Sequence, residues 1–325
     1  MRLEYLGWRV FYSFLAFAIS ITFTFILIHA MPGDYLHVIL PSLADKNPLA
    51  TELFEEQFGF DKPLVDQYVL YVINVFQGNW GYSIQYGQPV TAVIISKLCW
   101  TMIILLPATL LSILIGVAIG SYSGWSSGSL ADSFIFKIMI FLGAVPSYWW
   151  AIILILVLGF YLGLFPLGGY MSVRALNEGL SYYDVLYHAV LPIVALTLAM
   201  VPGVYYLMRT SMLQTVGQDY ILTARCKGLG ELKILQHHAL KNAMLPMVTM
   251  MAIELAHTIM GSVFVETIFS WPGMGYLTYE ALRVRDIPLL QGIFLMDTLI
   301  IILANMATDF SYPFIDPRAE VGKIG

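Results

Sequence analysis

The sequence predicts an all-α integral membrane protein with six transmembrane helices. Three observations carry this prediction: an apolar composition, six long apolar stretches, and an uneven distribution of Lys and Arg between the connections. Of the 325 residues, 59% are hydrophobic and 11% are charged, and the mean hydropathy is +0.77. Soluble domains carry roughly 25% charged residues. A soluble core could not bury this much apolar surface, so we expect a multi-pass protein of the cell membrane.

Each of the six stretches has about the 20 apolar residues that a helix needs to cross a bilayer. They run approximately from Val10 to Ala30, Trp100 to Tyr122, Ile135 to Leu162, Ala189 to Met208, Met247 to Phe269 and Leu289 to Phe310. The first could be a secretory signal, but it exceeds a typical h-region and lacks a small-x-small cleavage site. We expect a retained helix plus an extracytoplasmic segment over residues 1–97, and a transmembrane core over 98–325 with a cytoplasmic loop at 209–246.

The positive-inside tendency predicts that both termini lie in the cytoplasm. With the N-terminus inside, ten basic residues fall on the cytoplasmic side: Arg2, Arg9, Lys137, Arg209, Arg225, Lys227, Lys233, Lys241, Arg318 and Lys323. Six fall outside: Lys46, Lys62, Lys97, Arg174, Arg283 and Arg285. Cys99 and Cys226 then lie on opposite sides and cannot pair within one chain. We expect no metal site, because no zinc-type spacing occurs.

The segment between the first two spans contains one further helical pattern. Apolar residues recur at helical spacing from Pro63 to Phe76, a stretch too short to cross a bilayer. We expect this helix either on the membrane surface or packed on the bundle, with Gly78 to Gly81 ending it.

A polar, basic interval between two apolar stretches predicts a helical hairpin on the wet face of the membrane. Asp219 stands where an N-cap accepts backbone N–H bonds, and Tyr220 to Lys227 supplies two helical turns. Gly228 supplies the left-handed stop. A second short helix is expected to begin near Glu231 and run toward Pro246. A rigid hairpin of this kind suits docking to a partner.

The same interval resembles the cytoplasmic coupling loop of ABC importer permeases, in the dipeptide, oligopeptide and nickel branch. The residues that carry the resemblance are Gly217–Tyr220, Ala224–Arg225, Lys227–Leu229, His238–Leu240 and Leu245–Pro246. The resemblance implies contact with an ATPase at Asp219, Tyr220, Ala224, Arg225, Lys227, Gly228, Leu229, Gly230, His238 and Pro246. Further matches follow in the right order along the chain: Met31–Asp34, Tyr86–Val90, Val265–Gly275 and Asp316–Arg318. The resemblance therefore covers nearly the whole chain.

The resemblance implies a type-I ABC importer permease fold and half of a translocation pathway. The implied partners are a second homologous permease subunit, two ABC ATPase subunits and an extracytoplasmic solute-binding protein. The sequence has no phosphate-binding loop, so we expect ATP on the partner subunits, no cofactor on this chain and no enzymatic activity. No block of like charge indicates nucleic-acid binding. The implied solutes are peptides, with nickel or oligosaccharides as alternatives.

The motif after the fifth span predicts a tight outer turn. Pro272 fixes one dihedral, Gly273 and Gly275 permit positive φ, and Trp271 is expected at the level of the headgroups. The resemblance implies that this turn re-enters the membrane and helps to close the outer end of the pathway, with Glu266 capping it. A plain interfacial turn is the alternative.

Three ionisable residues are expected near the middle of the membrane: Glu254, His257 and Asp297. Buried charges are costly in the hydrocarbon, so these side chains should face the protein interior. They either line the pathway and attract cations or form a protonated structural network. Two other classes of function are disfavoured. A secondary transporter would show inverted repeats with broken helices, and an intramembrane enzyme would show a paired-aspartate or His-Glu-x-x-His motif; we find neither.

Overall fold

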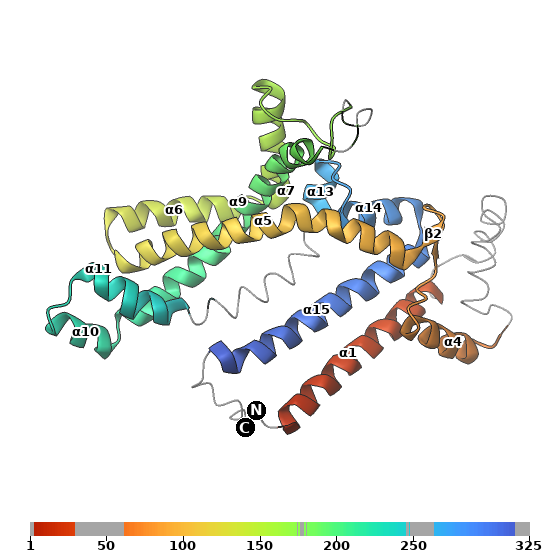
Figure 1. Cartoon of the computed structure of the whole chain (residues 1–325), viewed down its shortest axis with the longest axis horizontal. Coiled ribbons are helices and arrows are strands. Elements are labelled where there is room, and N and C mark those ends of the chain that lie inside the picture. Colours follow the sequence, from red (N-terminus) through yellow and green to blue (C-terminus); the bar gives the residue numbers. More distant parts are fainter. Residues whose placement is uncertain are drawn as a thin grey trace. The chain divides into compact units, whose positions relative to one another are not determined.

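The computed structural model describes residues 3–29, 62–173, 175, 179, 181–244, 247 and 263–315, and helices dominate these ranges (Figure 1). The α-helices are α1 Leu3–His29, α4 Leu64–Phe76, α5 Val90–Trp125, α6 Leu130–Ala144, α7 Ser147–Leu154, α9 Tyr182–Val216, α10 Asp219–Cys226, α11 Glu231–Ile234, α13 Val263–Ile268, α14 Met274–Val284 and α15 Ile287–Ile315. Two π-helices occur, η1 Ile155–Tyr161 and η2 Leu235–Ala239. A two-stranded antiparallel hairpin pairs β1 Tyr82–Ser83 with β2 Gln88–Pro89. The all-α prediction is confirmed.

Four described helices are long and apolar enough to cross a bilayer, over Gly7–Ile26, Val90–Trp125, Tyr182–Val216 and Ile287–Met306. The stretch predicted as a single third helix is instead broken. α6 and the α7–η1 segment meet at an angle of 93°. The cause is Pro146, since a residue before proline avoids the helical region, and Val145 is accordingly extended with ψ 119°. The predicted fifth span lies largely outside the described residues, so the count of six stays a prediction.

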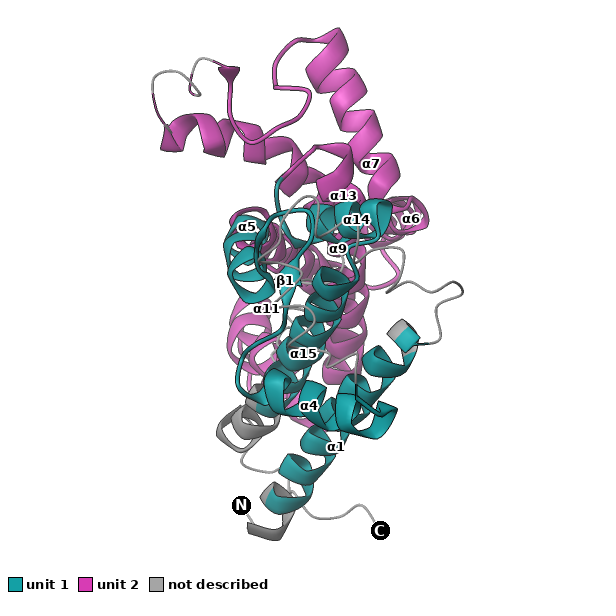
Figure 2. Ribbon diagram, turned by 90° about the vertical axis from the view of Figure 1, so that its right-hand side faces the viewer, with its two compact units in different colours: residues 1–101, 272–306 teal, residues 102–271, 307–325 magenta. Residues whose placement is uncertain are grey.

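The chain divides into two compact units (Figure 2). Unit 1 comprises residues 1–101 and 272–306, and unit 2 comprises residues 102–271 and 307–325. The core of unit 1 includes Ile21, Tyr71, Ile94, Leu277 and Ile293, all almost fully buried. The helix predicted at Pro63–Phe76 is α4, and it packs on α1. The hydroxyls of Thr22 and Tyr68 lie 2.7 Å apart, and the Phe25 ring stands edge-on to that of Tyr68.

A buried carboxylate ties the β-hairpin of unit 1 to the start of α15. Asp286 accepts hydrogen bonds from the Ser83 hydroxyl at 2.6 Å, from the Gln85 N–H at 3.0 Å and from the Leu289 N–H at 3.2 Å. Burial raises the pKa of Asp286, and the hydrogen bonds offset part of that rise. One side chain thus bonds both to the hairpin and to the start of α15.

In unit 2, α5 and α9 approach each other through three glycines spaced one helical turn apart. A Cβ atom on Gly120 would lie 2.8 Å from the Cβ of Met208, and one on Gly124 would lie 2.5 Å from the Cβ of Met212. Gly116 meets Val204 in the same way. Small residues allow close contact of helix backbones, which is the usual source of helix association in lipid.

Candidate functional site

The first helix of the predicted hairpin is α10, and its start differs from the prediction by one residue. Gln218 is the N-cap, with ψ 148° and no side-chain cap bond, and Asp219 is already helical. The prediction that Asp219 is the N-cap is therefore wrong. The extended backbone at Gln218 starts the helix one residue early. The Asp219 carboxylate still lies in the first turn, where the helix dipole favours a negative charge.

The end of α10 confirms the predicted stop at Gly228. This residue has φ +73°, in the left-handed region. Its N–H donates to the Arg225 carbonyl at 2.9 Å, and the Leu229 N–H donates to the Ala224 carbonyl at 3.4 Å. These two bonds form a Schellman motif. A Cβ atom on Gly228 would meet no other atom within 4 Å, so conformation alone makes glycine suitable there.

The returning segment of the hairpin begins at Glu231, as predicted. Gly230 is its N-cap with ψ 144°, and the chain continues as helix through the π-turns of η2 to Met244. Arg225 of α10 forms an ion pair with Glu231 of α11, in which Nε lies 3.1 Å from Oε1, and this pair links the two helices. The same guanidinium lies over the Trp125 ring, 5.5 Å from its centroid. The hairpin is thereby tied to the end of α5.

One face of the hairpin is buried on α9. Ile221 and Ala224 of α10 and Ile234 of α11 are almost fully buried in a cluster with Met208 and Met212 of α9. The cluster also contains Ala239, Ala243 and Met247. This apolar contact anchors α10 to the end of the long helix that precedes it, so that α10 does not project as a free loop.

The opposite face of α10 is exposed and partly apolar. Leu222 is 60% exposed and Tyr220 is 41% exposed. Thr223, Cys226 and Lys227 are exposed beside them. A short rigid helix with apolar side chains held outward is a surface suited to a protein partner.

Other residues predicted in the hairpin occupy mixed positions. Leu229 is half-buried against the cluster, and Gly230 is exposed. His238 is half-buried, and its carbonyl accepts a hydrogen bond from the Asn242 amide at 2.7 Å. Pro246 lies outside the described residues.

The outer turn departs from two predictions. The left-handed residue is Ser270, with φ +51°, whereas Gly273 has φ −91° and serves as the N-cap of α14. Gly275 lies inside α14. Trp271 is fully buried, so its indole packs inside the protein and does not contact headgroups, and its level in the membrane stays a prediction. Its backbone N–H donates to the Glu266 carbonyl at 2.8 Å, which folds the chain back over the end of α13.

Two other residues of the predicted turn, Pro272 and Glu266, lie next to Trp271 in the chain or at the turn that it ends. Pro272 follows the buried tryptophan, and Glu266 lies on α13 with its side chain fully buried. Among the described acidic residues, Glu266 is one of those with no solvent-exposed surface. Whether the turn closes a pathway stays a prediction.

The residues predicted at mid-membrane are only partly described. Asp297 lies on α15 and is half-buried. Glu254 and His257 lie outside the described residues. Among the residues that the structure does describe, no three His, Cys, Asp or Glu side chains gather as a metal site would require.

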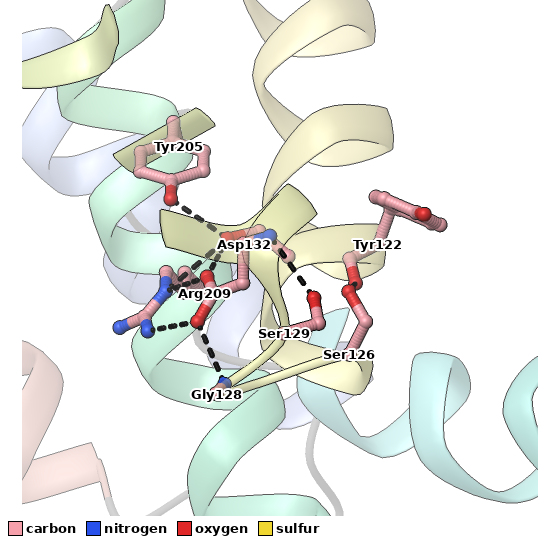
Figure 3. Close-up of polar contacts among 8 residues, drawn as sticks. Tyr122, Ser126, Gly128, Ser129, Asp132, Tyr205 and Arg209 are labelled. Atoms are coloured by element: carbon pink, nitrogen blue, oxygen red, sulfur yellow. Dashed lines mark hydrogen bonds and ion pairs between the residues drawn. The ribbon is translucent and has the colours of Figure 1, made fainter. Parts of the chain in front are cut away.

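A buried ion pair beside the hairpin escaped the sequence reasoning (Figure 3). Arg209 of α9 donates from Nε to Oδ1 and from Nη2 to Oδ2 of Asp132 on α6, each at 2.9 Å. Ser123 of α5 also donates to this carboxylate, and the Tyr205 hydroxyl lies 2.8 Å from the Ser123 hydroxyl. The local signal was a capping pattern, Ser129 followed three residues later by Asp132. Nothing in the sequence indicated Arg209 as its partner.

Three comparisons with known proteins bear on this site. The family described as "Binding-protein-dependent transport system inner membrane component" matches residues 113–321. The chain is 35% identical over 302 residues to the oligopeptide transport system permease protein AppB of Bacillus subtilis (strain 168), covering 91% of this chain and 93% of that protein. It is 30% identical over 313 residues to the dipeptide transport system permease protein DppB of Escherichia coli (strain K12), covering 91% and 92%.

A solved structure shares the fold. The structure described as inward-facing conformations of the MetNI methionine ABC transporter matches with a TM-score of 0.54 and 14% identity. The match covers 69% of this chain and 96% of that chain. At this identity the likeness concerns the fold alone.

Proposed function

This chain belongs to the family of binding-protein-dependent transport system inner membrane components, and on that premise we propose that it carries peptides as a permease subunit of an ATP-driven importer. It is a multi-pass membrane protein with the fold of type-I ABC importer permeases. Permeases of this kind are not enzymes, and they work with separate ATPase and substrate-binding proteins. The observation that carries the proposal is the 35% identity to an oligopeptide permease over 91% of the chain.

Peptides are favoured over the other solutes by the relatives. The relatives named above are an oligopeptide and a dipeptide permease. A third, of Pseudomonas aeruginosa (strain UCBPP-PA14), is a di/tripeptide permease with 31% identity over 310 residues, covering 91% of this chain and 92% of that protein. Nickel and oligosaccharides remain the competing solutes that an uptake assay should include.

The proposed assembly contains a second homologous permease subunit, two ABC ATPase subunits and one extracytoplasmic binding protein. In this assembly ATP binds only to the ATPase subunits. We assign the ATPase contact to the exposed face of α10, where Tyr220 and Leu222 project from a helix with a defined start and stop.

The contacts beneath α10 supply a physical route for the motion. Ile221 and Ala224 share a buried cluster with Met208 and Met212, so a displacement of α10 is passed to α9 through that cluster. Closure of the ATPase subunits would in this way shift a transmembrane helix as a rigid body and change the opening of the pathway. Interior packing transmits such a shift because it resists compression.

The experiment that tests the ATPase contact places a charge on the exposed face of α10. Leu222→Asp should abolish co-purification of the ATPase subunit with the permease. Ser127→Asp is the matched control, because Ser127 is exposed in the short connection after α5 and receives the same charge. Equal retention of the ATPase by both variants would contradict the assignment of α10.

A second experiment tests the solute. Proteoliposomes that contain the complete complex and its binding protein are supplied with radiolabelled trialanine, ⁶³Ni²⁺ or a maltooligosaccharide. We expect ATP-dependent accumulation of trialanine alone. Accumulation of nickel or of the sugar without the peptide would overturn the peptide assignment and leave the permease assignment standing.

A further inference from the structure

We propose that Asp132 and Arg209 are positioning residues that join the hairpin formed by α10 and α11 to the adjoining ends of α5, α6 and α9, so that these parts move as one body. The inference rests on the proposed function, since it concerns how a displacement of α10 reaches the transmembrane helices. It names residues that lie on α6 and α9, outside the exposed face of α10.

The ion pair has a geometry that fixes orientation as well as distance. Arg209 presents two parallel N–H groups to the two oxygens of Asp132, and its guanidinium also lies 5.1 Å from the centroid of the Phe136 ring. The side chains are 21% exposed for Arg209 and 5% for Asp132. A bidentate, largely desolvated pair resists rotation of either helix.

The Asp132 carboxylate accepts hydrogen bonds from the end of α5 and from the connection between α5 and α6, besides those from Arg209 of α9. Ser123 lies near the end of α5, Gly128 lies in the connection, and Asp132 lies in the first turn of α6. The Gly128 N–H donates to Oδ2 at 3.0 Å, and the Asp132 N–H is capped by the Ser129 hydroxyl at 3.1 Å (Figure 3). One carboxylate therefore closes the α5–α6 turn and holds it to α9.

The same turns of α9 carry the contacts to the hairpin. Met208 and Met212 flank Arg209 in sequence and pack against Ile221 and Ala224 of α10. A Cβ on Gly124 of α5 would lie only 3.0 Å from the Arg209 carbonyl oxygen, so the backbones of α5 and α9 touch at this level. Arg209 is thus the point at which the helix that bears the hairpin is locked to both of its neighbours.

The contact of Asp132 with Arg209 and Ser123 is called the joint from here on. On the side of the joint away from the hairpin, each of the three helices contains a proline or ends close to one. Pro107 lies inside α5, Pro202 lies inside α9, and Pro146 separates α6 from α7 at the 93° bend. A proline removes a backbone hydrogen bond and makes its helix easier to bend. We propose that the helices bend at these prolines. The part that moves as one body then lies between the prolines and the hairpin, and Asp132 and Arg209 hold it together.

The first test measures the joint in the full-length chain without any partner. Spin labels on native Cys226 and on Leu130→Cys, in a Cys99→Ser background, report the distance between α10 and the start of α6 in nanodiscs. Both positions are exposed, with Leu130 91% exposed. We expect one narrow distance distribution, which Arg209→Gln broadens at least twofold. Arg209→Lys keeps the charge but loses the two-pronged contact, and it should broaden the distribution to an intermediate extent.

The matched control breaks a different polar contact on α9. Asp184→Asn removes the carboxylate that lies 3.7 Å from His188 near the other end of the helix. It should leave the distance distribution unchanged. A narrow distribution retained by Arg209→Gln, or equal broadening by Asp184→Asn, would overturn the proposal.

The second test separates positioning from a general loss of structure. In proteoliposomes with the ATPase and the binding protein, Arg209→Lys should assemble normally but transport at least tenfold fewer molecules of trialanine for each ATP hydrolysed. Transport and hydrolysis that fall in parallel, at an unchanged ratio, would overturn the proposal. A wild-type chain that binds no ATPase would refute the proposed function. The distance measurements need no ATPase, so they would still test whether Asp132 and Arg209 hold the helices together.

Discussion

Gly228 and Ser270 occupy the same position in the same kind of helix stop. Gly228 has φ +73° and Ser270 has φ +51°. In each case the N–H of this residue bonds three residues back, to Arg225 or Thr267, and the next N–H bonds five residues back, to Ala224 or Glu266. For a residue with a Cβ this left-handed conformation costs about 1–2 kcal/mol, and for glycine it does not. The two stops therefore respond to mutation in opposite ways.

Gly228→Val should weaken the hairpin. A β-branched side chain at positive φ is strained, although no neighbouring atom lies within 4 Å to clash with its Cβ. We expect a loss of about 2 kcal/mol in the stability of the hairpin, and a corresponding loss of ATPase binding in a pull-down assay. Gly217→Ala is the control, since Gly217 has φ −77° and only ordinary contacts around a Cβ. Normal ATPase binding by a folded Gly228→Val protein would contradict the assignment of this hairpin.

Ser270→Gly should stabilise the protein. Glycine removes the left-handed penalty but adds about 0.5–1 kcal/mol of conformational entropy to the unfolded chain, so the net gain should be under about 1 kcal/mol. Ser270→Ala keeps the Cβ and isolates the contribution of the hydroxyl. Thermal unfolding in detergent measures both variants. A melting temperature for Ser270→Gly below that of Ser270→Ala would show that the backbone penalty is not felt here.

Asp286 predicts a dependence of stability on pH. Its pKa is raised in the folded state, so the folded protein holds the proton more tightly than the unfolded chain does. The stability from this group is fully present below the ordinary pKa of 3.8 and is lost as the pH rises through the raised value. The melting temperature of the wild type relative to Asp286→Asn should therefore increase as the pH is lowered from about 7.5 to about 5. A difference in melting temperature between the two proteins that stays constant over this range would contradict the prediction.

The predicted orientation places α10 in the cytoplasm and the β-hairpin outside. A single cysteine at position 226, in a Cys99→Ser background, should react with an impermeant maleimide only after cells are permeabilised. Gln88→Cys, with Cys226 also replaced, should react in intact cells, because Gln88 is exposed on β2. Labelling of both positions in intact cells would contradict the orientation with both termini inside.

Glu254 and Asp297 should tune selectivity if they line the pathway. Each carboxylate would act in a region of low dielectric, where charge is felt strongly. Glu254→Gln with Asp297→Asn should lower uptake of trilysine more than uptake of trialanine, by about tenfold for each 1.4 kcal/mol of lost attraction. An equal reduction for the two peptides, accompanied by a lower melting temperature, would support the alternative of a structural network.

Local features of the fold were predictable from the sequence, because their causes are local. Gly228 ends α10 through its own freedom of φ, and the apolar spacing after Pro63 produces α4. The N-cap of α10 was misplaced by one residue, since Gln218 holds that position through its extended backbone alone, without a side-chain cap bond, and Asp219 is already helical. The break between α6 and α7 also had a local signal, Pro146 itself. A criterion based on the length and hydropathy of the stretch does not register it.

Tertiary features were not predictable in the same way. Asp132 and Arg209 are 77 residues apart, and no periodicity in either helix marks them as partners. Trp271 was expected among headgroups because tryptophan favours that level, but its indole is fully buried in the protein, in a fold that residues distant in sequence complete. The distribution of basic residues likewise assigned Arg209 to the cytoplasmic side but gave no sign that most of its side chain is buried.

The outward-facing leucine and tyrosine of α10 have a consequence for the life of the protein in the cell. Leu222 and Tyr220 remain in contact with water until a partner covers them. A chain made in excess would therefore keep an exposed apolar surface, which favours aggregation and recognition by quality-control proteases. The abundance of this subunit should follow the supply of its ATPase, because assembly hides the feature that marks an orphan for removal.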